Sequence, residues 1–90
     1  MKKYIMLEND EPTWWVTKRE GTCPIVYNTL RDAQIALLED YQDTLDHQLE
    51  EFANNKREFD DIDLKCNAYI EDCEVTDIIT LNNGKTYNYY

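Results

Sequence analysis

Apolar and polar residues follow two different spacings along this chain of 90 residues. In the first third, short apolar stretches bounded by turn-forming residues predict strands at Lys2–Leu7, Thr13–Lys18 and Cys23–Tyr27. The segments Glu8–Pro12 and Glu20–Thr22 are rich in residues that favour turns. We therefore expect the first two strands to pair as a hairpin and all three to form a meander.

From Thr29 onward the apolar residues recur at intervals of three and four, which predicts one amphipathic helix from about Leu30 to about Asn54. Thr29 and Asp32 approximate a capping box at its start, with Asp in place of Glu. Such a helix is roughly 40 Å long at 1.5 Å rise per residue, more than a small sheet usually covers. Its apolar arc consists of Leu30, Ala33, Leu37, Leu38, Tyr41, Leu45, Leu49 and Phe52.

The last third holds two strand-like stretches, Ala68–Val75 and Asp77–Leu81, which could form one bent strand, and predicts a final strand at Lys85–Tyr90. Asn83-Gly84 is suited to a type I′ turn before that final strand. The whole pattern predicts an α+β fold of one domain, residues 1–90, in which an antiparallel sheet of about five strands (βββ-α-ββ) carries one long helix on one face. The helix residues Leu30, Leu37, Tyr41, Leu45 and Phe52 would pack on Ile5 or Leu7, Val16, Val26, Val75, Ile79 and Leu81.

Charge is distributed unevenly along the chain, whose 19 acidic and 9 basic residues give a net charge of −10. Residues 32–63 hold eleven acids and two bases, a net charge of −9, whereas residues 1–31 carry +1 and residues 64–90 carry −2. A surface this acidic disfavours direct binding to nucleic acid or to an anionic membrane, because both would repel it.

Five acidic residues are spaced by seven, four, three and four positions, so one continuous helix would place them on a line roughly 27 Å long. Like charges four residues apart cost a helix a few tenths of a kcal/mol per pair, which suggests that the charge is kept for use. A line of this kind could mimic the phosphates of a nucleic acid and bind a basic protein; the alternative is an ordinary solvated face. The five residues are Asp32, Glu39, Asp43, Asp46 and Glu50.

Two adjacent tryptophans, Trp14 and Trp15, point to opposite faces of their predicted strand, so at most one joins a core beneath the helix. The other could anchor a partner protein or pack under a loop. Tyr87, Tyr89 and Tyr90 suit a sheet face or edge that meets a partner or a second copy, and the alternative is that they are ordinary strand residues.

No set of residues in the sequence predicts catalysis, a metal site or a cofactor. His47 is the single histidine, and the three cysteines form no Cys-x-x-Cys pair, which is typical of reduced thiols in a cytosolic protein. The apolar run that ends at Leu7 is too short for a signal peptide or a membrane span. We therefore expect a cytoplasmic protein that is not an enzyme.

In its size, in the acidic segment Asp32–Asp63 and in its lack of catalytic motifs, the chain resembles the small acidic proteins that phages and mobile elements encode against host defences. The anti-CRISPR proteins are the best-known group. The ending Asn82–Tyr90, rich in Asn and Tyr, fits an AT-rich phage genome. The resemblance is one of overall character without a shared motif, and it implies a non-enzymatic inhibitor in the host cytoplasm; some such proteins act as DNA mimics.

The leading hypothesis is an inhibitor of a basic, nucleic-acid-binding protein such as a CRISPR effector or a nuclease. The five acidic residues would supply the charge, and Trp14 or Trp15 would anchor the contact. One alternative is an immunity protein that neutralises a nuclease toxin. Another is a structural protein that self-associates, for example as a homodimer, through its tyrosine-rich sheet edge.

Overall fold

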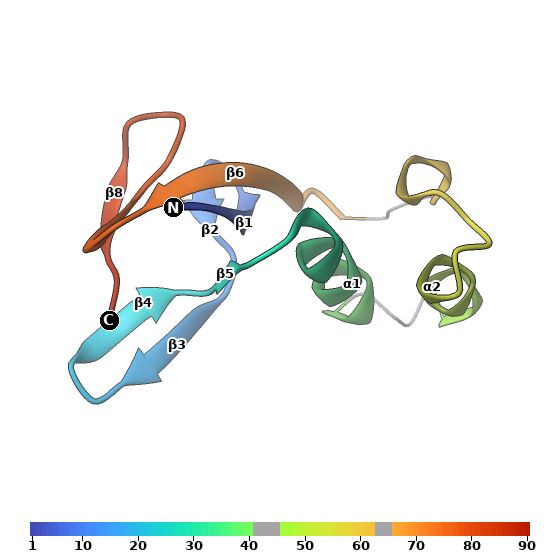
Figure 1. Cartoon of the computed structure of the whole chain (residues 1–90), viewed down its shortest axis with the longest axis horizontal. Coiled ribbons are helices and arrows are strands. Elements are labelled where there is room, and N and C mark those ends of the chain that lie inside the picture. The colour runs from blue at the N-terminus through green and yellow to red at the C-terminus, as the bar shows by residue number, and fades with distance from the viewer. Residues whose placement is uncertain (41–45, 63–65) are drawn as a thin grey trace.

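The computed structural model describes residues 1–40, 46–62 and 66–90. Strands β1 (Lys2–Glu8) and β6 (Tyr69–Val75) pair antiparallel from Lys2↔Glu74 to Leu7↔Tyr69 and form the middle of the main sheet. Figure 1 shows this curved sheet at one end of the molecule and the helices at the other. The predicted α+β class, with an antiparallel sheet of about five strands, is confirmed.

The other strands of the main sheet are short. Strands β7 (Ile78–Thr80) and β8 (Thr86–Asn88) extend it beyond β6, in the order β2-β1-β6-β7-β8. On the far edge of β1, both β2 (Glu11–Pro12) and β5 (Val26–Tyr27) pair with it.

The segment between β2 and β5 leaves the main sheet and forms a separate ribbon of two strands. These are β3 (Trp15–Lys18) and β4 (Gly21–Pro24), which pair only with each other. The predicted three-stranded meander is therefore wrong in its pairing, since β3 does not pair with β1. The chain leaves β1 after the two residues of β2, at the buried Pro12.

The predicted turn at Glu8–Pro12 is present, whereas the turn at Asn83-Gly84 differs in type from the prediction. Asn9 and Asp10 have φ of 55° and 65° between the paired residues of β1 and β2, so they form the type I′ turn of this fold. At the predicted site only Gly84 has positive φ (90°), while its N–H donates to the Leu81 carbonyl (3.0 Å). The N–H of Leu81 in turn donates to the Lys85 carbonyl (2.9 Å), which makes a three-residue loop with a glycine bulge.

Two short helices, α1 (Leu30–Asp40) and α2 (Asp46–Ala53), replace the single long helix predicted from Leu30 to Asn54. The start of α1 and the end of α2 both follow known capping rules. Thr29 Oγ1 accepts the N–H of Asp32 at 3.0 Å, which confirms the predicted N-cap. Helix α2 ends in a Schellman motif at Asn55 (φ 61°), whose N–H donates to the Phe52 carbonyl (3.0 Å).

One contact excludes a continuous straight helix across this region. Arg31 and Phe52 would be separated by about 31 Å at 1.5 Å rise per residue. Instead, Arg31 Nη2 donates to the Phe52 carbonyl at 3.0 Å, so the end of α2 lies beside the start of α1. Folding the helices back in this way buries apolar residues that a small sheet could not cover.

Among the described residues, the buried apolar side chains form three clusters, one on each face of the sheet and one between the helices. Because side chains alternate along β1, Met6 points to one face and Ile5 and Leu7 to the other. Helix α1 covers the Met6 face through Leu37. A second cluster joins the helices through Leu38, Phe52 and Ile62. The largest cluster lies on the other face of the sheet and contains Ile5, Leu7, Cys73, Val75, Ile79 and Leu81.

The predicted core beneath the helix is thus wrong in several members. Leu30 and Val16 are exposed, at 45% and 36% of their surface, and Phe52 packs in the cluster between the helices. The large cluster on the sheet is bordered by Tyr87 and Tyr89, so the β3–β4 ribbon rather than the helix approaches that side. Tyr41 and Leu45 lie outside the described residues.

Candidate functional site

Four of the five acidic residues singled out in the sequence lie on two helices of one lobe, which we call the helical lobe (residues 30–40 and 46–62). Asp32 and Glu39 belong to α1, and Asp46 and Glu50 to α2. Asp43 lies outside the described residues. Since the two helices fold back on each other, these acids do not form the straight row that one long helix would give. Asp32, Glu39 and Glu50 are all exposed.

The arginines of the helical lobe are engaged within the lobe itself. Besides its bond to Phe52, Arg31 Nη2 lies 3.4 Å from the carbonyl oxygen of Ala53, and its guanidinium carbon lies 4.7 Å from the centre of the Phe52 ring. Arg57 pairs with Glu51 at 2.9 Å through Nη2 and at 3.0 Å through Nε. These two positive charges therefore serve helix packing and capping rather than the acids of the outer surface.

Other acids of the lobe are exposed without a basic neighbour. Among the described residues, no basic group lies within ion-pair distance of five exposed carboxylates. Partial burial, with Glu39 beside it, raises the pKa of Asp40 above its ordinary value, as expected where acids crowd. The five exposed carboxylates are Asp32, Glu50, Glu58, Asp60 and Asp61.

A polar hollow of about 340 Å³ lies where α2 ends. Its walls mix both charges, with Glu51, Lys56, Arg57 and Asp61 among them, so it presents no uniform field. Nowhere in the described part of the chain do three or more His, Cys, Asp or Glu residues gather as a metal site would require. His47 is exposed on α2.

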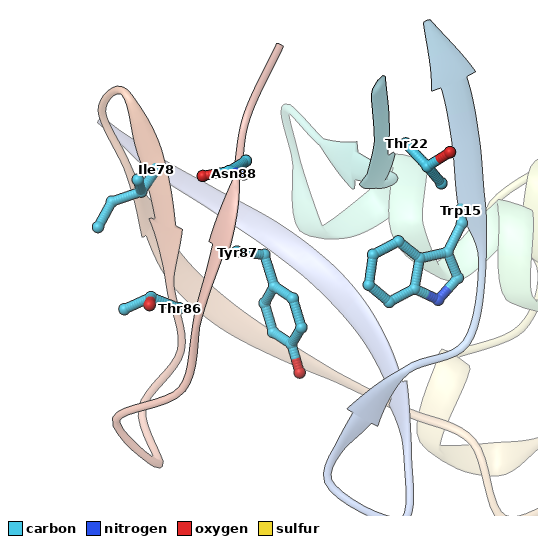
Figure 2. Close-up of a pocket in the computed structure, with 6 residues that line it drawn as sticks. All are labelled: Trp15, Thr22, Ile78, Thr86, Tyr87 and Asn88. Carbon is cyan, nitrogen blue, oxygen red and sulfur yellow. The ribbon is translucent and has the colours of Figure 1, made fainter. Parts of the chain in front are cut away.

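Trp15 is the first residue of β3 and Trp14 precedes it, so both tryptophans lie at the start of the β3–β4 ribbon. Trp14 and Trp15 are 42% and 45% exposed, and neither joins the core beneath the helix. The Trp15 ring meets the Tyr87 ring edge to face, with centroids 5.5 Å apart and planes at 80° (Figure 2). A shallow hollow of about 320 Å³ lies between β8 and the ribbon at this contact.

The last residues of the chain tie the ribbon to the main sheet. Lys18 Nζ lies 5.0 Å above the Tyr89 ring and donates a hydrogen bond to the Tyr90 carbonyl. The Tyr90 ring also packs closely on Gly21. The sequence marked both the tryptophans and the tyrosines, but only the fold brings them together. We call this region the aromatic end, and its exposed apolar residues are Trp14, Trp15, Val16, Ile78 and Tyr90.

The described helices are too short or too polar to cross a membrane. Comparison with known proteins returned nothing: no family model, no curated protein and no solved structure matches this chain.

Proposed function

We propose that this protein is a non-enzymatic inhibitor that binds a basic, nucleic-acid-binding protein of a host defence system through its helical lobe. One observation carries the proposal. The lobe exposes many carboxylates, while Arg31 and Arg57 are held within it by Phe52, Ala53 and Glu51. The outer surface of the lobe therefore keeps its negative charge.

An acidic surface of this kind suits a partner that normally binds phosphates. Such a partner gains much of its affinity for nucleic acid through Lys and Arg residues. The acidic lobe would compete for the same basic groove, and long-range attraction would accelerate the encounter. Because α1 and α2 lie side by side, the mimicry would come from a broad acidic patch, not from a single row of carboxylates.

The test compares two sets of charge-neutralising substitutions in the 90-residue protein. The first removes Asp32, Glu39 and Glu50 as Asp32→Asn, Glu39→Gln and Glu50→Gln. The matched control removes three exposed acids of the strands and their turns, as Glu11→Gln, Glu20→Gln and Asp77→Asn. Both proteins carry the same net charge, so only the position of the lost carboxylates differs.

The unmodified protein and each variant are immobilised and used to capture partners from a nuclease-treated host-cell lysate. The captured partners are then eluted with rising salt. We expect one basic nucleic-acid-binding protein, displaced by added DNA and released by salt. The helical triple variant should bind this protein at least about tenfold more weakly, and the control should change affinity by less than about threefold. Equal loss in both variants, or no competition by DNA, would refute the proposal.

A further inference from the structure

The outer edge of β3 is an unpaired strand edge. Strand β3 pairs only with β4, and it borders the molecule in Figure 1. The register fixes which backbone groups face outward. Ile25 N–H donates to the Trp14 carbonyl at 3.0 Å, so Trp14 and Ile25 form a hydrogen-bonded pair. Such pairs alternate in an antiparallel ribbon, which makes Trp15↔Pro24 a pair without hydrogen bonds.

The alternation directs the N–H and C=O groups of Trp15 and Thr17 away from β4. Pro24 supports this register, because it lacks the N–H that a bonded position would require. Among the described residues, the outward groups of Trp15 and Thr17 have no backbone partner. Each outward residue therefore offers one donor and one acceptor to another strand.

This edge has little of the protection that sheet edges usually carry. All four residues of β3 are exposed, and Trp15, Val16 and Thr17 strongly favour extended structure. Proteins commonly block such an edge with charges, prolines or bulges. The one charge on β3 is Lys18, whose ammonium group is directed to Tyr89 and Tyr90.

We propose that β3 pairs with β3 of a second copy, antiparallel about a two-fold axis at Val16. Trp15 of each copy would then exchange backbone hydrogen bonds with Thr17 of the other, and the two Val16 residues would lie opposite each other. The two ribbons would join into one sheet of four strands, with Trp14 and Val16 of both copies on one face.

Charge makes the ribbon a less repulsive contact surface for a second copy than the helical lobe is. Two chains of net charge −10 repel each other most strongly through their helical lobes. Residues 13–24, which form the ribbon, contain two bases and one acid. Because the ribbon lies at the end of the molecule away from the helices, pairing through β3 keeps the two acidic lobes apart (Figure 1). The dimer would also leave both lobes free for the proposed partner.

The test measures the mass of the purified protein by sedimentation equilibrium over a wide concentration range. We expect a reversible change from 10.8 kDa to twice that value, and added salt should strengthen the association by screening the repulsion. Thr17→Pro removes an outward N–H without removing a β3–β4 backbone hydrogen bond, and should weaken dimerisation at least about tenfold. It also removes the hydroxyl contact between Thr17 and Thr22 (3.3 Å), which the control variant loses as well. Thr22→Pro is the matched control, because Thr22 lies opposite Thr17 in the ribbon and off the proposed interface.

Amide hydrogen exchange of the unmodified protein gives a second readout that needs no variant. The amides of Trp15 and Thr17 in β3 should become protected as protein concentration rises, while the exchange of the β4 amides changes little. A monomer at every concentration would overturn the proposal. So would a dimer in which these two amides stay unprotected, which would indicate a different interface, and so would protection that appears only with a different protein bound to the edge.

Discussion

Arg31 and Phe52 are joined by two contacts that hold the ends of the two helices together. The guanidinium of Arg31 donates to the Phe52 carbonyl at 3.0 Å, and it also lies 4.7 Å from the centre of the Phe52 ring. The carbonyl belongs to the last turn of α2, where the helix dipole is negative, and it also accepts the N–H of Asn55 at 3.0 Å. One side chain from the first turn of α1 thus caps α2 and packs on it.

We predict that Arg31→Ala lowers the free energy of unfolding by about 1–2 kcal/mol, because it removes a charged hydrogen bond at a helix C-terminus and an aromatic contact. Urea unfolding measures the loss. Arg19→Ala is the control, since Arg19 is exposed in the turn between β3 and β4 and changes the net charge equally. If both variants lose the same stability, the cause is net charge and the Arg31 contact contributes nothing specific.

The helix break could not be predicted from the spacing of apolar residues. Leu37 faces Met6 on the sheet, whereas the next residue, Leu38, faces Phe52 of the other helix. Both leucines fit the one apolar arc that a single long helix would have, and no Gly or Pro separates α1 from α2. The Thr29 cap, by contrast, depends on neighbouring residues only, and was predicted correctly.

Local sequence rules also located the turns and most strands, but they did not determine which strands pair with each other. The predicted turn around Asn9 and Asp10 exists, yet Pro12 ends its short strand and the ribbon leaves the sheet. The contact between Trp15 and Tyr87 joins residues 72 positions apart, which no local pattern encodes. For the candidate site, the sequence identified the acidic segment and the aromatic residues, but the shape of each surface comes from the tertiary fold.

Gly21 gives a test of how the aromatic end is assembled. Its φ is +151°, and an added Cβ would lie 3.0 Å from Cε2 of Tyr90. We predict that Gly21→Ala costs about 1 kcal/mol and displaces the Tyr90 ring, which should alter the near-ultraviolet circular dichroism.

Gly84→Ala is the matched control for this substitution. Gly84 also has positive φ (+90°), but no atom lies within 4 Å of an added Cβ. It should lose stability through backbone strain alone and leave the aromatic spectrum unchanged. Identical spectra for the two variants would show that Tyr90 does not pack on Gly21.

The three cysteines should react with alkylating reagents in a fixed order. Cys23 and Cys73 are buried and Cys66 is half-buried. Burial, with Asp72 and Glu74 adding to it, raises the pKa of Cys73 from its usual 9.0 to about 11, which leaves little of the reactive thiolate near neutral pH. We predict that Cys66 is labelled first in the folded protein. Mass spectrometry of the labelled peptides gives the order, and equally fast labelling of Cys73 would contradict the burial.

The same shift predicts a loss of stability at high pH. Folding raises the pKa of Cys73, so above pH 9.0 the unfolded chain loses this proton before the folded chain does. The contribution of the Cys73 thiol to the free energy of unfolding is therefore complete below pH 9.0 and is lost as the pH rises toward about 11. Cys73→Val removes the thiol, so the gap in unfolding free energy between the two proteins should change over this interval. A constant gap would exclude the shift.

Asp72 gives a prediction of the opposite sign at low pH. Its carboxylate accepts a hydrogen bond from Asn82 Nδ2 at 2.9 Å and pairs with Lys2 Nζ at 3.2 Å, and these contacts lower the pKa of Asp72 below its usual 3.8. Because the pKa of Asp72 is lower in the folded chain than in the unfolded chain, its carboxylate stabilises the folded state at pH values above the unfolded pKa. This stabilisation is lost as the pH falls through the folded pKa.

Asn82→Ala removes the largest single cause, so the pKa of Asp72 should rise toward 3.8 in a carboxyl NMR titration. Lys2→Gln removes the neighbouring ammonium charge and should also raise this pKa. Asn83→Ala is the control, because the Asn83 amide donates to the Asp10 carbonyl and does not contact Asp72. The loss of stability in Asn82→Ala should be largest near neutral pH and shrink in acid, once Asp72 is protonated in both proteins. A loss that stays the same at all pH values would mean that Asn82 acts only through its bond to the Asp72 backbone carbonyl.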